Sequence, residues 1–497
     1  MRSMTAGLFG VGILGGALAW PGPSRLEAQI PSPSRPLAPL QVGGGFRFRL
    51  EAWDWFVPGT PADHAYAFGA GLLRGGIGMV RPGYDWLVEV AAPLLLGLPR
   101  NPVAPAPQGQ LGLGAAYRVE NGDRKIGLLP KQAFFRVKLG RTGAAPTLRI
   151  GRFEFNEGQE IQPQDVTLAW LKRERISQRL IGNFGFSHVG RSLDGVHLQR
   201  ATPRTDVTLV AARPTEGVFQ LDGLGELDVE LAYLALTRAL FPRLAATGPT
   251  PRAEARLFAI YYQDHRGVLK TDNRPVSARS ADPTGIHIGT FGAHYLQVVR
   301  LGPGRADLLL WGAAQLGDWG SEPHRAQAYA AELGYRFDFP PGPWLRAGYL
   351  RGSGDGDAQD GRHGTFFEIL PTPRPYARLP FYNLMNVEDA FAQVLLVPTP
   401  RLAFRADAHL LRLAESADLW YTGGGAFDQT SFGYTGRPSG GAGSLGRLID
   451  LSADYQVSPR FAVTLYAGHV FGQEVIRSVY PQGAAATFAY LELTRRF

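Results

Sequence analysis

Hydrophobic and charged residues alternate with a period of two along most of the chain. In residues 46–51, two phenylalanines and a leucine alternate with two arginines and a glutamate. The same alternation recurs in residues 135–139, 253–259, 402–409 and 449–455. Successive side chains of a β-strand point to opposite faces, so each segment has one apolar face and one charged face. The pattern therefore predicts an all-β protein between residues 42 and 497.

The lengths of these segments favour a transmembrane barrel over a soluble sheet. Many run for 10–15 residues, whereas strands of globular proteins are usually about five or six residues long. A tilted strand needs about 9–11 residues to cross the hydrocarbon layer. Twenty segments qualify, although 109–119 and 166–173 match the alternation poorly. Because bacterial barrels close with an even number of strands, we expect a transmembrane antiparallel β-barrel of about 18 strands (18–20).

The connections between the predicted strands are of two kinds. Short turns containing proline occur at 302–304, 340–343, 398–400 and 457–460. Long glycine-rich loops occur between them, at 266–284, 354–386 and 414–445. Outer-membrane barrels have short periplasmic turns and long extracellular loops. The alternation of the two kinds therefore predicts a location in the cell outer membrane of a Gram-negative-type bacterium.

The N-terminal segment is typical of a secretory signal peptide. A positively charged start at Arg2 precedes an uncharged, mostly apolar stretch at 5–20, and a small-residue cleavage site follows at Ala28. An N-terminal membrane anchor is less favoured, because sixteen residues with five glycines would barely span a bilayer. We therefore expect a signal peptide at 1–28, a flexible lead-in at 29–41 and a single outer-membrane β-barrel domain at 42–497.

Composition excludes several kinds of chemistry and points to an anionic partner. The chain has no cysteine, which excludes disulfides, thiolate metal sites and cysteine nucleophiles. It has 51 Lys+Arg against 43 Asp+Glu, a net charge of +8, and such a surplus favours anionic ligands. The acidic loop 354–361 lacks the bidentate glutamate of a calcium loop. No cofactor, metal or nucleic-acid partner is expected.

The charged faces of the strands predict a charged lumen. A charge on the lipid face costs about 2–4 kcal/mol at mid-membrane, so the charged residues should point inward. The residues expected there are Arg47, Arg49, Arg136, Lys138, Arg256, Arg405 and Asp450. Two interpretations stay open: salt bridges that only hold strands together, or arginines that concentrate anions in a pore. Arg149 and Arg152 can both point inward only if Gly151 forms a β-bulge.

Several motifs resemble the alginate-export family of outer-membrane porins. The first is 151–154 (GRFE) followed by 190–196 (GRSLDGV), and the second is 352–355 (GSGD) followed by 363–372 (HGTFFEILPT). The stretch 445–451 (LGRLIDL) resembles the family's antepenultimate strand. The chain departs from the family pattern at 371–380, where Arg374, Tyr376 and Arg378 occur. The order and spacing of the motifs carry the resemblance.

The resemblance implies a fold, a substrate and site residues. The family's fold is an eighteen-stranded monomeric barrel whose arginine-rich constriction passes a polyuronate, and a long periplasmic loop can plug it. Carried over residue by residue, it points to Arg152, Arg191 and Arg362 as pore or loop cations, and to Glu154 and Asp194 as counter-charges; Arg149 is a candidate pore residue from the strand pattern alone. The implied partners are an anionic polysaccharide, outer-membrane lipid and periplasmic export-scaffold proteins.

The expected function is export or diffusion of an alginate-like polyuronate, without catalysis. One alternative is a general or anion-selective porin for small solutes, which has the same fold. The other is a barrel enzyme such as a lipase or deacylase, although no Gly-x-Ser-x-Gly motif occurs.

Overall fold

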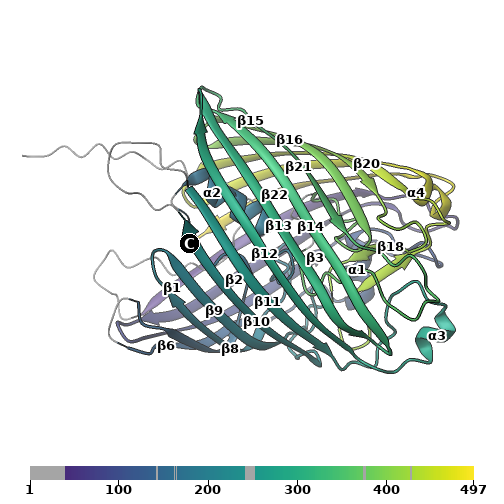
Figure 1. The fold of residues 1–497 in the computed structure, drawn as a ribbon, viewed down its shortest axis with the longest axis horizontal. Helices are drawn as coiled ribbons and strands as arrows, with labels where there is room; N and C mark the ends of the chain where they lie inside the picture. The colour runs from purple at the N-terminus through teal and green to yellow at the C-terminus, as the bar shows by residue number, and fades with distance from the viewer. Residues whose placement is uncertain are drawn as a thin grey trace, which may run out of the picture.

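Eighteen antiparallel strands form one closed barrel in the computed structural model of the protein (Figure 1). The structure describes residues 40–140, 144–161, 163, 165–240, 252–372, 377–425 and 428–497. The predicted signal peptide and nearly all of the lead-in lie outside the described residues. The sheet closes because β22 pairs with β1, from Gly45 opposite Arg496 to Asp54 opposite Thr487. The prediction of an 18-stranded barrel is confirmed.

The barrel strands follow one another around the wall in chain order. They are β1 (Gln41–Asp54), β2 (Ala65–Val80), β3 (Tyr84–Leu96), β6 (Leu129–Lys138), β7 (Thr147–Phe153), β8 (Leu193–Ala201), β9 (Thr205–Pro214), β10 (Val229–Leu240), β11 (Arg252–Asp264), β12 (Ile286–Leu301), β13 (Gly304–Trp319), β14 (Glu322–Phe337), β15 (Trp344–Gly352), β16 (Val387–Thr399), β17 (Leu402–Arg412), β20 (Ser444–Ser458), β21 (Phe461–Gly472) and β22 (Ala485–Arg496). Apart from the closing pair of β22 and β1, each neighbouring pair is therefore joined by a single turn or loop, as in an up-and-down barrel.

Short elements occupy the connections. They are β4 (Val103–Ala104), β5 (Gly109–Gln110), α1 (Leu113–Asn121), α2 (Val166–Leu171), the π-helical turn η1 (Lys172–Ile176), α3 (Val276–Ser280), β18 (Trp420–Gly423), β19 (Tyr434–Arg437) and α4 (Glu474–Val479). Among the described residues, no helix has the length and apolarity needed to span a membrane.

Two candidate strands of the sequence analysis were wrong. Residues 109–119 form the short β5 and most of α1, and residues 166–173 form α2 and the start of η1. The second segment becomes helical because Asp165 caps it: its carboxylate accepts hydrogen bonds from the backbone N–H groups of Thr167 at 3.0 Å and Leu168 at 3.1 Å.

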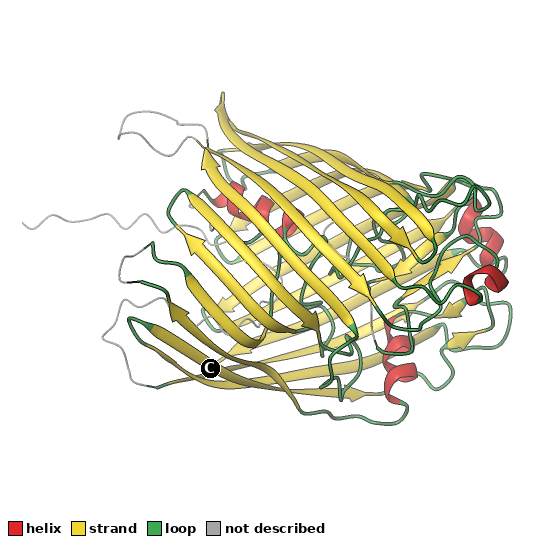
Figure 2. Ribbon diagram, turned by 60° about the horizontal axis from the view of Figure 1, so that its bottom comes forward, coloured by secondary structure: helices red, strands yellow, loops and turns green. Residues whose placement is uncertain are grey.

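The two ends of the barrel differ (Figure 2). At one end, here named the turn end, β1 begins at Gln41 and β22 ends at Arg496. The tight turns at 302–303, 400–401 and 459–460 lie at the same end. The other, the loop end, carries the longer connections with α1, α3 and α4. The predicted separation of short turns from long loops is therefore present.

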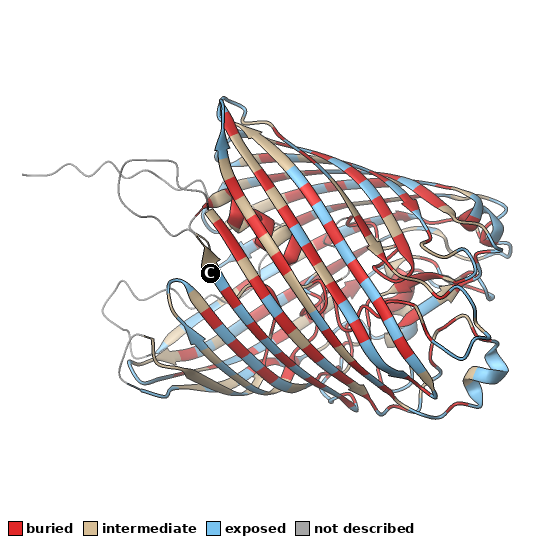
Figure 3. Ribbon diagram, in the orientation of Figure 1, coloured by how far each residue is buried: buried red, intermediate tan, exposed pale blue. Residues whose placement is uncertain are grey.

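Burial alternates along most of the wall strands, as Figure 3 shows, with β2 the clearest exception. On β1, Phe46 and Leu50 are exposed on the outer face, whereas Arg47, Arg49 and Glu51 are buried on the inner face. In a membrane the exposed apolar side chains contact lipid, and the charged ones surround the lumen.

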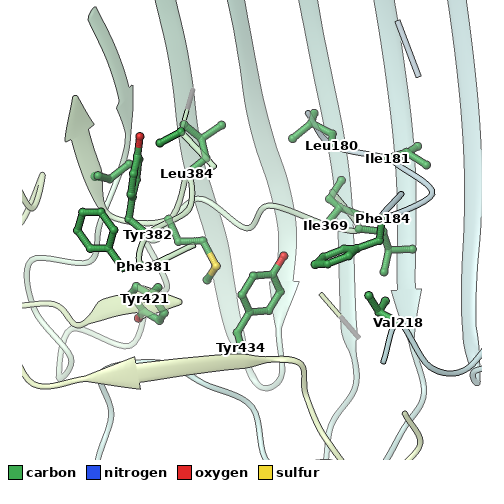
Figure 4. Close-up of a cluster of buried hydrophobic side chains, with 14 of the residues drawn as sticks. Leu180, Ile181, Phe184, Val218, Ile369, Phe381, Tyr382, Leu384, Tyr421 and Tyr434 are labelled. Atoms are coloured by element: carbon green, nitrogen blue, oxygen red, sulfur yellow. The ribbon is translucent and has the colours of Figure 1, made fainter. Parts of the chain in front are cut away.

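Two loops fold inward from the loop end and occupy much of the lumen. Loop 154–192 carries α2 down to the turn end, where Asp165 lies 3.0 Å from Arg252. Loop 353–386 runs alongside it, and their backbones pair: the Leu370 N–H donates to the Leu180 carbonyl at 3.0 Å. An apolar cluster that includes Ile181, Phe184, Ile369, Phe381, Tyr421 and Tyr434 packs around this pairing (Figure 4). The loops thus form an internal plug that is held by buried apolar contacts.

Candidate functional site

A cavity with predominantly basic walls lies between loop 154–192 and the inner face of the barrel. Its volume is about 180 Å³. We name it the basic cavity; seven basic residues line it, namely Arg47, Arg49, Arg74, Lys131, Arg173, Arg378 and Arg405. Three acidic residues also line it, namely Glu154, Glu174 and Glu492. Four further carboxylates pair with these basic residues from just outside the cavity, namely Glu51, Glu89, Asp407 and Asp454.

The basic cavity reaches toward both ends of the barrel, because Lys131 lies near the loop-end start of β6. Arg405 is the fourth residue of β17, and Glu492 is the fifth from the end of β22; both positions are close to the turn end. Strand alternation places both side chains inward, since Phe404 and Leu491 beside them are exposed on the outer face.

Arg49 and Glu492 form the central ion pair of the wall. They are opposite each other in the β1–β22 register. The Arg49 Nη2 is 2.6 Å from the Glu492 carboxylate, and its Nη1 donates to Glu51 at 3.2 Å and to the Phe186 carbonyl at 2.9 Å. The guanidinium also lies 3.7 Å from the Phe186 ring centroid, a cation–π contact. Arg49 therefore holds the loop against the wall.

A second cluster forms around Arg74. Its guanidinium bridges Glu89 at 2.5 Å and Glu154 at 2.6 Å. Lys131 lies 3.6 Å from Glu154 and donates to the Val189 carbonyl at 2.8 Å. Here basic and acidic groups balance locally, so this side of the cavity is structured by ion pairs.

Arg47 is held mainly by neutral groups. Its guanidinium donates to the carbonyl oxygens of Gly185, at 2.6 Å, and Ser187, and Glu492 is 3.9 Å away. A carbonyl satisfies a donor without cancelling its charge, so Arg47 contributes positive potential to the cavity.

Four of the sequence-predicted site residues line the basic cavity: Arg47, Arg49, Glu154 and Arg405. Arg405 also bonds to Asp407 on the same strand. Asp450 lies next to the cavity, because its carboxylate accepts a hydrogen bond from the Arg378 backbone N–H at 2.9 Å.

Three other predicted residues point inward but lie elsewhere in the lumen. Arg256 bonds to Glu157 of loop 154–192. Arg136 pairs with Asp85 at 2.8 Å toward the turn end, where Lys138 ends β6 in an exposed position. Arg149 donates to His197 at 2.6 Å.

Arg152 and Asp194 lie on the outer face, away from the cavity. The register of β7 is continuous through Gly151, so no bulge brings Arg152 inward. Arg152 shares its face with the exposed Ile150, and it pairs with Asp194 at 2.5 Å. The family motif suggested a pore position, whereas strict alternation places this pair near the rim of the loop end.

The remaining two predicted residues belong to loops. Arg191 is buried and donates to the carbonyls of Leu370 at 2.6 Å and Gly424 at 3.1 Å, which ties three loops together. Burial lowers the pKa of Arg191 to about 10. Arg362 is exposed in loop 353–386.

The sequence analysis missed most of the cavity's other charged residues. Arg74 lies in a glycine-rich stretch where alternation is weak, and Lys131 lies beside a register shift between β3 and β6. Arg173 and Glu174 are in the helical part of loop 154–192. Arg378 lies where the chain departs from the family pattern. Within the described residues, no group of three or more His, Cys, Asp or Glu side chains is arranged to hold a metal ion.

A closed barrel with an apolar outer face and a charged, loop-constricted lumen defines an outer-membrane channel. Solved structures with this fold include the outer membrane protein OpdK from Pseudomonas aeruginosa (9% identity, 92% of this chain and 99% of that chain, TM-score 0.53) and OccK9 (OpdG) from the same organism (13%, 92% and 98%, 0.54). OccAB2 from Acinetobacter baumannii is similar, with 9% sequence identity over 92% of this chain and 98% of that chain and a TM-score of 0.53. These likenesses concern the fold alone.

The family follows from the sequence itself. The chain belongs to the alginate export family, whose sequence model matches residues 131–488. No curated protein matches the chain. The outer-membrane location and the channel class predicted from the sequence are thereby confirmed. The turn end accordingly faces the periplasm, and the loop end faces the outside.

Proposed function

We propose that the protein conducts an anionic polysaccharide, an alginate-like polyuronate, out of the periplasm through the basic cavity. The observation that carries the proposal is the clustering of seven basic side chains around this cavity, of which Arg47 is bound mainly by neutral backbone carbonyls. Rings of basic side chains select anions, and arginine binds carboxylates in a planar, bidentate geometry. Each uronate unit of the polymer offers one carboxylate to such a site.

The carboxylates that line the cavity suit transport rather than tight binding. A conducting site must attract its ligand strongly enough for uptake and weakly enough for release. Glu492 and Glu154 already neutralise part of Arg49 and Arg74, so a passing uronate competes with them and can be displaced. Interleaved charges of this kind would let a polymer move from one arginine to the next.

Passage of a polymer also requires the inward loops to move. The cavity of about 180 Å³ is smaller than the roughly 300–1,000 Å³ of usual ligand sites, and the apolar cluster of Figure 4 fills the lumen toward the loop end. In the proposal, loops 154–192 and 353–386 separate when polymer is exported. In the proposal the protein acts as a monomer, because one chain closes a complete barrel. Periplasmic export-scaffold proteins would deliver the polymer to the turn end.

A second candidate is an anion-selective porin for small solutes. It is favoured by the same small volume, since a single uronate or similar acid would need no loop movement. The barrel-enzyme alternative has no part in the proposal, because family and fold are those of channels.

Conductance measurements in planar bilayers test the proposal. We expect anion selectivity in the reversal potential, and block of the current by oligouronates but not by neutral oligosaccharides of equal length. Arg405→Gln should weaken both effects about fivefold, because one charge at about 4 Å contributes about 1 kcal/mol in water. Arg213→Gln is the control, since Arg213 is exposed on the outer face and pairs with Glu230.

The outcomes separate the two candidates. Block by polymers of many units supports the polysaccharide channel. Block by monouronates alone supports the small-solute porin. Cation selectivity that Arg405→Gln leaves unchanged contradicts both.

A further inference from the structure

The outer face of the barrel carries an apolar groove toward the loop end. It lies over β15, β16, β17, β20 and β21, and its volume is about 850 Å³. Three small outward residues, Ala390, Ala392 and Ala408, leave the surface hollow there. The larger apolar side chains Leu410 and Ile449 also line it. The volume is within the range of ordinary ligand sites, about 300–1,000 Å³.

Two arginines line the same groove at its loop-end edge. Arg447 is opposite Leu410 on one side and Phe471 on the other, and it is the outward residue that follows Ile449 toward the loop end. Arg477 lies on α4, in the loop above. Both arginines are exposed, and none of the described residues that line the groove is acidic.

This arrangement places positive charge where the headgroups of the outer leaflet lie. From Ile449, the outward side chains of β20 continue toward the turn end as Leu451, Ala453, Tyr455 and Val457, an apolar band that contacts lipid tails. Arg447 is the next outward residue beyond this band. A cation on the lipid face is costly at the midplane but costs little near the interface. The nearby outward carboxylate of Glu388 is already paired, with Arg351 at 3.2 Å.

We propose that the groove binds a phosphorylated, acylated glycolipid of the outer leaflet, of the lipid A type. An acyl chain would lie over the alanines, and the phosphates would bond to Arg447 and Arg477. The loop end faces the outside, so the lipids that reach the groove are those of the outer leaflet. Arginine pairs with phosphate through two parallel hydrogen bonds, which favours a phosphate headgroup over a neutral one.

The experiment measures lipid binding to the full chain folded in detergent, by native mass spectrometry. The probes are bisphosphorylated lipid A, the same lipid without phosphates, and inorganic phosphate. The double variant Arg447→Gln/Arg477→Gln removes the charges, and Ala408→Phe fills the groove. The matched control is Arg213→Gln/Arg325→Gln, which removes two exposed arginines near the loop end that lie outside the groove. Heat-dependent gel mobility shows whether each variant has folded.

The expected result is a selective loss of lipid A. The double variant should bind it about 100-fold more weakly, roughly tenfold per arginine, and Ala408→Phe should weaken it independently of charge. The control should bind it as the parent protein does. Equal binding of the lipid without phosphates, equal loss in the control, or binding of inorganic phosphate as tight as that of lipid A overturns the proposal.

Discussion

Glu332 joins the inner wall to loop 154–192 through an ion pair, and removing its charge should weaken the attachment of that loop. The side chain lies on β14, where its carboxylate is 3.0 Å from the Nε of Arg175 in η1 and 2.9 Å from the Nη1 of Arg346 on β15. All three side chains are fully buried. Glu332→Gln keeps the shape of the side chain and removes the negative charge, so both arginines lose an ionic partner.

The size of the effect follows from the burial of the pair. Breaking a buried ion pair by removing one partner costs about 3–5 kcal/mol. Other pairs hold the same loop, including Lys172 with Glu254 at 2.8 Å, so we take the lower figure of about 3 kcal/mol. That difference raises the population of the detached loop about 100-fold. The barrel itself should remain folded, because its strand pairing does not involve this side chain.

Single-channel recording is the assay. Glu332→Gln should increase the frequency of large-conductance openings about 100-fold. Glu230→Gln is the control: Glu230 forms an exposed ion pair with Arg213, and such pairs contribute only about 0–1 kcal/mol. If the folded Glu332→Gln protein opens no more often than this control, the buried pairs do not hold the loop closed, and the reasoning is refuted.

Two further predictions concern the plug. Arg191→Gln should leave the barrel folded but make loops 353–386 and 413–443 more sensitive to limited proteolysis. The reason is that the Gly424 carbonyl loses its Arg191 donor, at a cost of about 1–3 kcal/mol. Equal cleavage of both proteins would contradict this. Burial raises the pKa of Glu368 in loop 353–386 from 4.5 to about 8, so the packed loop binds a proton that the released loop loses. Packing of the loop should therefore be strongest below about pH 4.5 and weaken as pH rises to 8, which predicts more channel openings at pH 8 than at pH 5. Glu368→Gln should abolish that pH dependence. A parent channel whose openings do not change with pH would contradict the prediction.

The wall could be predicted from the sequence because each strand meets the same local requirement. A membrane strand must expose apolar residues on one face, and the period of two fixes which residues those are. The segment from Phe46 to Glu51 is sufficient to place Arg47 and Arg49 inward. The same rule places Arg152 outward beside Ile150, whereas the family motif predicted a pore position there. Residues 166–173 lack the alternation, and Asp165 caps them as a helix.

The plug could not be predicted, because its path depends on contacts between distant segments. Loop 154–192 stays in the lumen through pairing of Leu180 with Leu370 and through Arg175 with Glu332. The residue pattern within the loop has no periodicity from which those partners could be predicted. Arg173 and Arg378 reach the basic cavity only because both loops turn inward, as do Glu154 and Glu174. Four of the ten charged residues of the site are therefore set by tertiary structure rather than by strand alternation.

Alternation also cannot separate a structural arginine from one that attracts a ligand, since both point inward. Their partners make the distinction. Arg346 is neutralised by Asp307 at 3.1 Å and Glu332 at 2.9 Å, so it stabilises the wall and adds little potential to the lumen. Arg47 is bound mainly by backbone carbonyls of the loop, which satisfy its donors and leave its charge. Under the proposed function, a carbonyl-bound arginine such as Arg47 would both anchor the loop and attract the polymer. Release of the loop would then free its donors for the polymer's carboxylates.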